Sequence, residues 1–306
     1  MPDQGMLADV YDERYFSNST FFAGENEAIY GYYDYLAERF NRQVSYRTTI
    51  ERIVSLLDRD PREASLLDVG CGLGYLMDCA HDSGFAVSGV EFNAAAAAQL
   101  RQKYVFPVHV GDMQSYTGRT HDVITMMDVI EHLRDPVQII RQIRRSLTDD
   151  GLLVMTTMDC DSPMSRILGP RLEDFRRVRE HLYFFTRQSI RRLLCHEGFE
   201  VMSIRYHGHT FRLDFLAERC ALISPILGAV ARVVIKTLRL GSIHIHLNPG
   251  TKMIIFARKK TDGANQGAPQ QTNVSTDTAD ELRVGKQDSA TTEPAWRAQA
   301  GLTPGQ

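Results

Sequence analysis

The sequence predicts an α/β protein whose doubly wound sheet has seven mostly parallel strands, and three observations point to this class. Short apolar runs alternate with helical stretches from Leu66 to about Thr157, which is the pattern of βαβ units. The first apolar run, LLDVGCGLG at residues 66–74, ends in closely spaced glycines. Two more strand patterns follow a capped helical stretch later in the chain. Together these patterns indicate a single sheet.

The order of the elements follows from the same patterns. Strands are expected near 65–70, 86–91, 107–111, 121–127, 151–157, 199–206 and 252–258. Helices fit between the first five strands at about 74–83, 94–103 and 135–148. Asp135 is a suitable N-cap for the last of these helices, and Pro136 occupies its first helical position. Thr186 can likewise cap a helix that runs through His196 and ends at Gly198.

The sequence divides into a central domain that contains the sheet, a segment before it and a segment after it. Residues 1–60 are expected to form an N-terminal helical cap, because 27–57 look helical and are rich in tyrosine. Residues 61–260 carry the sheet, with an amphipathic helical insertion at 208–250. Residues 261–306 have few large apolar side chains, and their polar composition predicts a disordered C-terminal tail.

Composition and charge exclude several classes of protein. The 306 residues are 43% hydrophobic and 24% charged, as in globular proteins. The net charge of -3 comes from the predicted tail, so residues 1–260 are balanced and give no electrostatic reason to expect nucleic acid. The five cysteines form no C-x-x-C pair, and acids occupy the start of the chain, MPDQGMLADVYDERYF. We therefore expect a cytoplasmic protein with neither a disulfide framework nor a zinc site.

The spacing of the glycines indicates which ligand their loop holds. Gly70, Gly72 and Gly74 read G-x-G-x-G, and Tyr75 stands where the dinucleotide pattern G-x-G-x-x-G has its third glycine. No Lys-Ser or Lys-Thr pair follows, so the loop is not a P-loop. The sequence therefore disfavours both phosphate ligands.

At these residues the chain resembles the class I S-adenosylmethionine-dependent methyltransferases, whose first motif is D-x-G-x-G-x-G. The matching residues are Asp68, Gly70, Gly72 and Gly74. The resemblance extends over roughly 65–157 and implies a Rossmann-like methyltransferase fold that binds S-adenosylmethionine. It also implies that the loop, with Cys71 between its first two glycines, holds the methionine part of the cofactor, and that Asp68 faces the ammonium group.

Three later motifs extend the resemblance. Glu91 ends the second strand, where both this family and dinucleotide folds place a carboxylate on ribose hydroxyls. Asp112 is implied to accept a hydrogen bond from the adenine amine, with Met113 giving a backbone contact and Phe92 an apolar face. Within HDVITMMDVIEHL, Asp128 is implied to lie near the sulfonium and its methyl group. Each acid alone is also typical of an ordinary strand end, so the prediction depends on all four motifs occurring in order.

The catalytic groups follow from the chemistry of methyl transfer. Displacement from a sulfonium needs alignment, and a hydroxyl acceptor also needs its proton removed. His181, in EHLYFFT after the fifth strand, is the first candidate for this base, and His132, preceded by Glu131, is the second. For either histidine, the alternative is a structural hydrogen bond to the backbone. The turn after the fourth strand reads DVIE and lacks the Asn/Asp-Pro-Pro-aromatic motif of amine and amide methyltransferases, which favours an oxygen acceptor.

A metal site is the alternative role for this turn. Asp128, Glu131 and His132 could form a cluster, but the chain lacks the additional downstream ligands expected for a magnesium-dependent catechol-type enzyme. We therefore expect no metal.

The wider sequence, from YDERYF through VIEHL and EHLYFFT to GFEV, is similar to a branch that includes quinone-biosynthesis O-methyltransferases. By the same resemblance, aromatic side chains at the N-terminus close over the cofactor, and Tyr35 or Arg47 approaches its carboxylate. The aromatic residues are Tyr11, Tyr15 and Phe16.

Two segments bear on partners, while the oligomeric state stays open. MSRILGPRLEDFRRVRE is rich in arginine and could either gather an anionic group or form a solvated lid of mixed charge. Over 225–239, helical spacing puts apolar side chains on one side and Arg232, Lys236 and Arg239 on the other. That pattern suits a peripheral membrane contact, and equally packing on the domain or on a second subunit.

The sequence thus predicts an enzyme that moves a methyl group from S-adenosylmethionine to a small-molecule acceptor, with a hydroxyl on an apolar or anionic metabolite favoured. Two alternatives stay open. One is a nicotinamide-dependent oxidoreductase on a Rossmann-like fold, which the glycine spacing disfavours. The other is a non-catalytic module that binds S-adenosylmethionine without turnover. A nucleic-acid or protein methyltransferase would be expected to show a basic face or a partner-binding domain, and the sequence shows neither.

Overall fold

A computed structural model describes residues 39–172, 175, 181–213, 220, 224–241 and 243–261 of the chain. All of them belong to the first of two units, Met1–Ala264. The expected N-terminal cap therefore falls within the described residues only from Arg39 on. The expected tail lies outside them except at Thr261.

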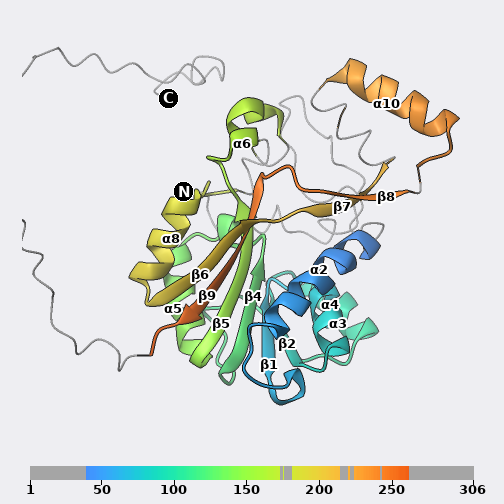
Figure 1. The fold of residues 1–306 in the computed structure, drawn as a ribbon. Helices are drawn as coiled ribbons and strands as arrows, with labels where there is room; N and C mark the ends of the chain where they lie inside the picture. Colours follow the sequence, from blue (N-terminus) through green and yellow to red (C-terminus); the bar gives the residue numbers. More distant parts are fainter. Residues whose placement is uncertain are drawn as a thin grey trace, which may run out of the picture. The chain divides into compact units, whose positions relative to one another are not determined.

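Seven strands form one sheet in the order β3-β2-β1-β4-β5-β9-β6 (Figure 1). Neighbouring strands are parallel from β3 to β5, whereas β9 runs antiparallel to both β5 and β6. The strands are β1 (Ser65–Val69), β2 (Ala86–Glu91), β3 (Val108–Val110), β4 (His121–Met127), β5 (Leu147–Met158), β6 (Phe199–Tyr206) and β9 (Lys252–Lys259). The predicted seven-stranded, mostly parallel sheet is confirmed.

Helices cover both faces of this sheet, with α5 and α8 on one side and α2, α3 and α4 on the other (Figure 1). The helices are α2 (Arg39–Val54), α3 (Tyr75–Asp82), α4 (Ala94–Lys103), α5 (Pro136–Ser146), α6 (Pro163–Leu168), α8 (Arg187–His196) and α10 (Pro225–Thr237). Single turns of 3-10 helix are η1 (Pro61–Glu63), η2 (Ile130–His132) and η3 (Gly169–Arg171).

The central strands alternate their side chains between two buried clusters. In β1, Leu67 packs in the cluster that includes Ile140 of α5, while Leu66 packs in the cluster that includes Met77 of α3. This is why these strands read as continuous apolar runs in the sequence instead of alternating with polar residues. The sheet is the rigid layer that carries the loops at its edge.

Local capping explains why the helix boundaries were predictable. Asp135 accepts a hydrogen bond from the backbone N–H of Gln138 at 2.9 Å, ahead of Pro136. Thr186 and Ser189 form a reciprocal capping box at the start of α8. The strand boundaries agree less closely, since β5 begins at Leu147, four residues before the predicted start, by pairing with His121 of β4.

A second, two-stranded sheet lies in the segment that was expected only as an amphipathic helical insertion. The strands β7 (His209–Arg212) and β8 (His244–Leu247) pair antiparallel, with Thr210 opposite His246. Between them α10 begins at Pro225 after the N-cap Ser224. No helix among the described residues is long and apolar enough to cross a membrane.

The order of the strands determines where a ligand can bind. From β1 the chain passes outward through β2 to β3, and then returns to the other side of β1 with β4. Neighbouring loops diverge at such a switch point, which leaves a crevice at the carboxyl ends of the strands. In this protein the glycine loop leaves β1 at that end.

Candidate active site

A cleft of about 500 Å³ lies at the carboxyl ends of β1, β2 and β4. Its volume is within the range of small-molecule sites. The predicted cofactor residues on its wall are Asp68, Gly70, Cys71, Gly72, Glu91, Phe92, Asp112, Met113 and Asp128. His132 also lines it, whereas Gly74, Glu131 and His181 do not.

The glycine loop adopts a backbone that other residues rarely tolerate. Gly70, Gly72 and Gly74 have φ values of 74°, 51° and 78°. A Cβ on Gly70 would also lie 2.5 Å from the side chain of Val129. Gly74 has a different place, because it precedes α3 and a Cβ there would lie 3.0 Å from Leu100. Its position off the cleft wall reflects helix packing.

Glu91 joins this loop to the end of β2. Its two carboxylate oxygens accept backbone hydrogen bonds from Gly72 at 2.7 Å and Asn93 at 2.8 Å. Burial raises the pKa of Glu91, and the backbone N–H groups partly oppose that rise. Each carboxylate oxygen has a second lone pair. The side chain can therefore fix the loop and still accept hydrogen bonds from a ligand.

Asp68 lies at the base of the cleft. Its Oδ1 accepts a hydrogen bond from the Thr125 hydroxyl at 2.7 Å. Burial, aided by the negative charge of Glu91 and opposed by the Thr125 hydrogen bond, raises the pKa of Asp68 to about 7. Burial and these two acids also raise the pKa of the Cys71 thiol, which keeps it neutral. A cationic group is the ligand that would favour the charged form of Asp68.

The opposite part of the wall combines an exposed ring with an exposed acid. The side chain of Phe92 is 58% exposed, and Met113 is buried. Asp112 is exposed, and its Oδ1 accepts a hydrogen bond from the backbone N–H of Ser115 at 2.9 Å. Apolar surface beside a carboxylate suits a flat heterocycle that carries an amine.

Glu131, His132 and His181 form a cluster behind the cleft. Their potential ligand atoms lie within 4.8 Å of one another, and the two imidazole centroids are 4.8 Å apart. Burial and the nearby charge of Asp128 raise the pKa of Glu131 well above its ordinary value. A carboxylate with two imidazoles could also hold a divalent transition metal. His132 is the member of the cluster that reaches the wall of the cleft.

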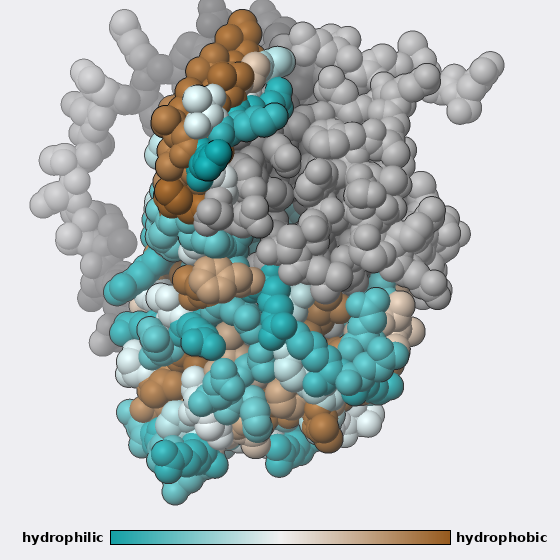
Figure 2. Space-filling view, turned by 90° about the vertical axis from the view of Figure 1, so that its right-hand side faces the viewer, coloured by the Kyte–Doolittle hydropathy of each residue, from teal (hydrophilic) through white to brown (hydrophobic). Residues whose placement is uncertain are grey.

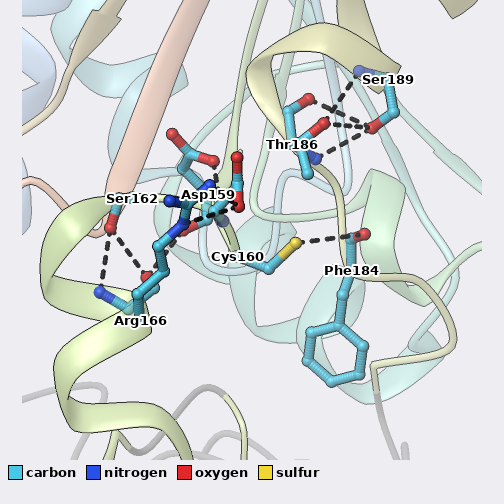
Figure 3. Close-up of polar contacts among 9 residues, drawn as sticks. Asp159, Cys160, Ser162, Arg166, Phe184, Thr186 and Ser189 are labelled. Atoms are coloured by element: carbon cyan, nitrogen blue, oxygen red, sulfur yellow. Dashed lines mark hydrogen bonds and ion pairs between the residues drawn. The ribbon is translucent and has the colours of Figure 1, made fainter.

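Backbone hydrogen bonds bring His181 to this cluster across 50 residues of sequence. Leu182 and Tyr183 both donate their backbone N–H to the carbonyl of Glu131, at 2.8 and 3.2 Å. In Figure 3 the Cys160 thiol points to the carbonyl of Phe184, and the sulfur–oxygen distance is 3.6 Å. These contacts hold the segment against η2, and His181 is buried as a result.

Several residues on the wall were not predicted as cofactor contacts. Arg42 and Tyr46 come from α2, and their spacing of four residues is the signal that they share one helix face. Arg47 is not on the wall, and it lies 3.6 Å from Asp82. The predicted N-terminal contacts, Tyr11, Tyr15, Phe16 and Tyr35, fall outside the described residues.

The residues present fit S-adenosylmethionine in kind and position. A glycine turn lies beside an acid for an ammonium group, a second acid ends β2 where a ribose would lie, and an exposed ring adjoins a third acid. This order along the cleft matches methionine, ribose and adenine.

Comparison with known families agrees with this geometry. A family model described as a methyltransferase domain matches residues 38–204, which is more than half of the chain. The chain therefore belongs to the methyltransferase-domain family, and within it to the class I S-adenosylmethionine-dependent methyltransferases. The predicted class and its cofactor are confirmed.

The similarity to curated proteins is confined to part of each chain. A ubiquinone biosynthesis O-methyltransferase of Histophilus somni is 31% identical over 109 residues, which cover 32% of this chain and 46% of that protein. A tRNA U34 carboxymethyltransferase of Aeromonas salmonicida is 27% identical over 116 residues, which cover 34% and 35%. The chain thus spans less than half the length of the curated relatives it matches, and the shared part does not identify an acceptor.

A solved structure shares the fold. A methyltransferase chain from the Haloferax volcanii complex with the activator Trm112 superposes with a TM-score of 0.51 at 12% identity, covering 74% of this chain and 95% of that one. A Thermotoga maritima S-adenosylmethionine-dependent methyltransferase gives a TM-score of 0.48 at 17% identity, covering 74% and 93%. At these identities, only the fold is transferable.

Proposed function

We propose that this protein transfers the methyl group of S-adenosylmethionine to a hydroxyl oxygen of a small-molecule acceptor. The observation that carries the proposal is the single cleft in which Asp68, Glu91 and Asp112 follow one another beside the glycine turn. These acids come from the ends of β1, β2 and β3, so the parallel sheet itself spaces them. The bound cofactor would supply a methyl group on a sulfonium, whose sulfur leaves readily as a neutral thioether.

His132 is the group we assign to the acceptor proton. It lines the cleft next to Asp128, and its ring adjoins that of His181. When the acceptor oxygen forms its bond to the methyl carbon, the bond between that carbon and the sulfonium sulfur would break, S-adenosylhomocysteine would leave, and the hydroxyl proton would pass to the imidazole of His132. His181, the first candidate from the sequence, is buried behind His132 in this arrangement, so we assign it to positioning the His132 ring.

An oxygen acceptor of small size has more support than a nucleic acid. The turn at Asp128 reads DVIE, and relatives named as O-methyltransferases share this part of the chain. One matched relative is named for tRNA, but residues 1–260 carry no net charge, which gives polyanion binding no general attraction. The alternatives, a nicotinamide oxidoreductase and a module that binds without turnover, are separated by the experiment below.

Titration calorimetry with S-adenosylhomocysteine and, in parallel, with NAD tests the cleft directly. We expect micromolar binding of S-adenosylhomocysteine and no heat with NAD. Asp112→Ala should weaken binding about tenfold, because an exposed side chain that contacts the ligand is removed without disturbing the core. Asp58→Ala, at another exposed acid, is the matched control. Binding of NAD alone would refute the assignment.

Turnover then decides between an enzyme and a binding module. The full chain is incubated with methyl-labelled cofactor and a panel of phenols, catechols, hydroxy acids and amines, with total tRNA as a separate sample. We expect label in a hydroxyl compound that disappears with Asp68→Ala. Label in amines or tRNA alone would contradict the oxygen acceptor while leaving the cofactor site intact.

A further inference from the structure

The helix α10 presents a broad apolar surface to solvent. Figure 2 shows these side chains as a continuous brown ridge along the helix, with teal side chains at its edge. Their exposed fractions run from 46% to 79%. The residues of this apolar face are Ile226, Leu227, Val230, Val233, Val234 and Leu238.

The apolar face is separate from the side of α10 that packs inward. Gly228 is buried, and Ala231 and Ile235 are half-buried. At 3.6 residues per turn these three positions share one narrow side, while the apolar face spans an arc of about 140° next to it. The folded chain therefore leaves the larger hydrophobic side of the helix exposed to solvent. Single exposed apolar residues are normal on protein surfaces, whereas a contiguous apolar patch of this kind marks an interaction site.

The charged side chains from Pro225 to Arg239 all have one sign. Arg232, Lys236 and Arg239 are exposed on the side opposite the apolar face. From Arg219 to Thr261 the sequence contains no Asp or Glu, so no acid within that stretch neutralises them. A surface that is both apolar and cationic complements one that offers hydrocarbon beneath anionic headgroups.

We propose that α10 binds peripherally to a lipid bilayer that contains anionic phospholipids. The apolar face inserts at the boundary between headgroups and acyl chains, with the helix axis parallel to the surface. The long side chains of the three cations reach from the polar side of the helix toward the lipid phosphates. Their charges then lie within about a Debye length of the bilayer surface. With 13 residues the helix is about 20 Å long, which suits lying on a bilayer rather than crossing it.

A second copy of the chain explains the surface less well. Two α10 helices packed on their apolar faces would bury the apolar residues and leave all six cations on the outer sides of the pair. Neither helix, nor the stretch from Arg219 to Thr261 around it, supplies a carboxylate to pair with them. A second copy would therefore account for the apolar face but not for the cations, whereas an anionic bilayer accounts for both.

The contacts of the second sheet connect this surface to the cleft. After α10 the chain enters β8, where the His244 ring lies 4.8 Å from the ring of Phe40 in α2. Arg42 and Tyr46, on the same helix, line the cleft. A bilayer held at α10 would therefore bring a lipid-soluble acceptor to the segment that contacts α2, the helix that lines the cleft; this consequence rests on the proposed methyl transfer, and the binding itself does not.

Vesicle sedimentation of the full purified chain tests the proposal. Vesicles of phosphatidylcholine alone are compared with vesicles containing about 30 mol% phosphatidylglycerol, at about 0.05 and 0.5 M salt. We expect the chain to pellet with the anionic vesicles at low salt and to bind at least tenfold more weakly to the neutral ones or at high salt. A chain that stays in the supernatant with anionic vesicles at low salt overturns the proposal.

Substitutions assign the effect to α10. Ile226→Asp and Val233→Asp should each lower binding at least tenfold, and Lys236→Glu should lower it on anionic vesicles only. Val105→Asp, at a fully exposed valine outside the helix, is the control, with Arg145→Glu on α5 for the charge change. Thermal melting and S-adenosylhomocysteine binding verify that each variant is folded.

Two further outcomes count against the proposal. Equal loss in the control variants would show that α10 is not the contact. A wild-type dimer that Ile226→Asp converts to a monomer would assign the apolar face to a second copy of the chain. Sedimentation needs neither cofactor nor acceptor, so its failure is distinguishable from a failure of the proposed methyl transfer.

Discussion

The ammonium of Lys252 lies 2.6 Å from Oδ2 of Asp128, which joins β9 to the turn after β4 across 124 residues of sequence. The other oxygen of Asp128 accepts a hydrogen bond from the Thr156 hydroxyl at 3.0 Å, and the backbone of Asp128 has φ of 53°. Three strands thus hold one carboxylate at the edge of the cleft, in a conformation that a free chain rarely adopts.

Removal of this ion pair should weaken cofactor binding and lower the stability of the fold only moderately. Lys252→Met leaves the carboxylate of Asp128 with Thr156, and we expect about tenfold weaker S-adenosylhomocysteine binding and a loss of about 1 to 3 kcal/mol in the free energy of unfolding. Lys260→Met, at the exposed residue just after β9, should change neither. Calorimetry and urea unfolding measure the two effects. A variant indistinguishable from wild type in binding would show that Asp128 needs no such support.

Glu91 should be more sensitive to substitution than its position at a strand end suggests. In Glu91→Gln, the amide NH₂ group must face the backbone N–H of either Gly72 or Asn93. Both groups are donors, so that backbone N–H loses its hydrogen bond. We expect cofactor affinity to fall about tenfold to a hundredfold and the melting temperature to drop by several degrees. Glu63→Gln, in exposed η1, serves as the control for the same chemical change. Full affinity in the Glu91 variant would remove Glu91 from the site.

The raised pKa of Asp68 makes both stability and binding depend on pH. Its pKa is about 7 in the fold and 3.8 in the unfolded chain, so the folded state retains the proton longer. This group therefore favours folding below about pH 4, and its contribution is lost progressively as pH rises from about 4 to about 7. Binding of an ammonium needs the charged form, so cofactor affinity should rise between about pH 6 and pH 8.

Asp68→Asn separates the two effects. The variant should be more stable than wild type at about pH 8, by on the order of 4 kcal/mol at most, with the difference vanishing near pH 4. Its cofactor affinity should be low and flat with pH. Melting curves and calorimetry at matched pH values measure both properties. A wild-type affinity that does not change from pH 6 to pH 8 would argue against Asp68 as the partner of the ammonium.

His132 should affect turnover without affecting cofactor binding. With an acceptor from the screen, His132→Gln should lower kcat about a hundredfold while the Kd of S-adenosylhomocysteine stays within about twofold. For His181→Gln we expect a smaller decrease in kcat, because His132 still takes the proton. The pH profile of kcat should shift, because the ring of His132 is no longer positioned by His181. His196→Gln, at an exposed histidine of α8, is the control. Unchanged turnover in His132→Gln would transfer the role of base to another group.

Metal removal tests the alternative role of Glu131, His132 and His181. If His132 acts as a base, dialysis against a chelator should leave both turnover and cofactor affinity unchanged. Elemental analysis of the purified protein should likewise find no stoichiometric divalent metal. Activity that is lost on chelation and restored by one divalent cation would instead assign the cluster to metal binding.

The sequence by itself determined the class of this protein and most of its sheet. Apolar runs, caps and turn residues are local signals, and each strand of a buried parallel sheet carries its own. The positions of the glycine loop, Glu91 and Asp112 at the edge of the sheet could be predicted in the same way, because each lies at or just after the end of a strand that was already visible.

The tertiary structure decided what depends on contacts between distant segments. Lys252 reaches Asp128 only because β9 pairs antiparallel with β5, and His181 is buried only because its segment donates hydrogen bonds to Glu131. The sheet of β7 and β8 and the exposure of the apolar face on α10 have the same origin. Strand pairing and side-chain packing select these contacts from many that the sequence permits, so no local sequence pattern predicts them.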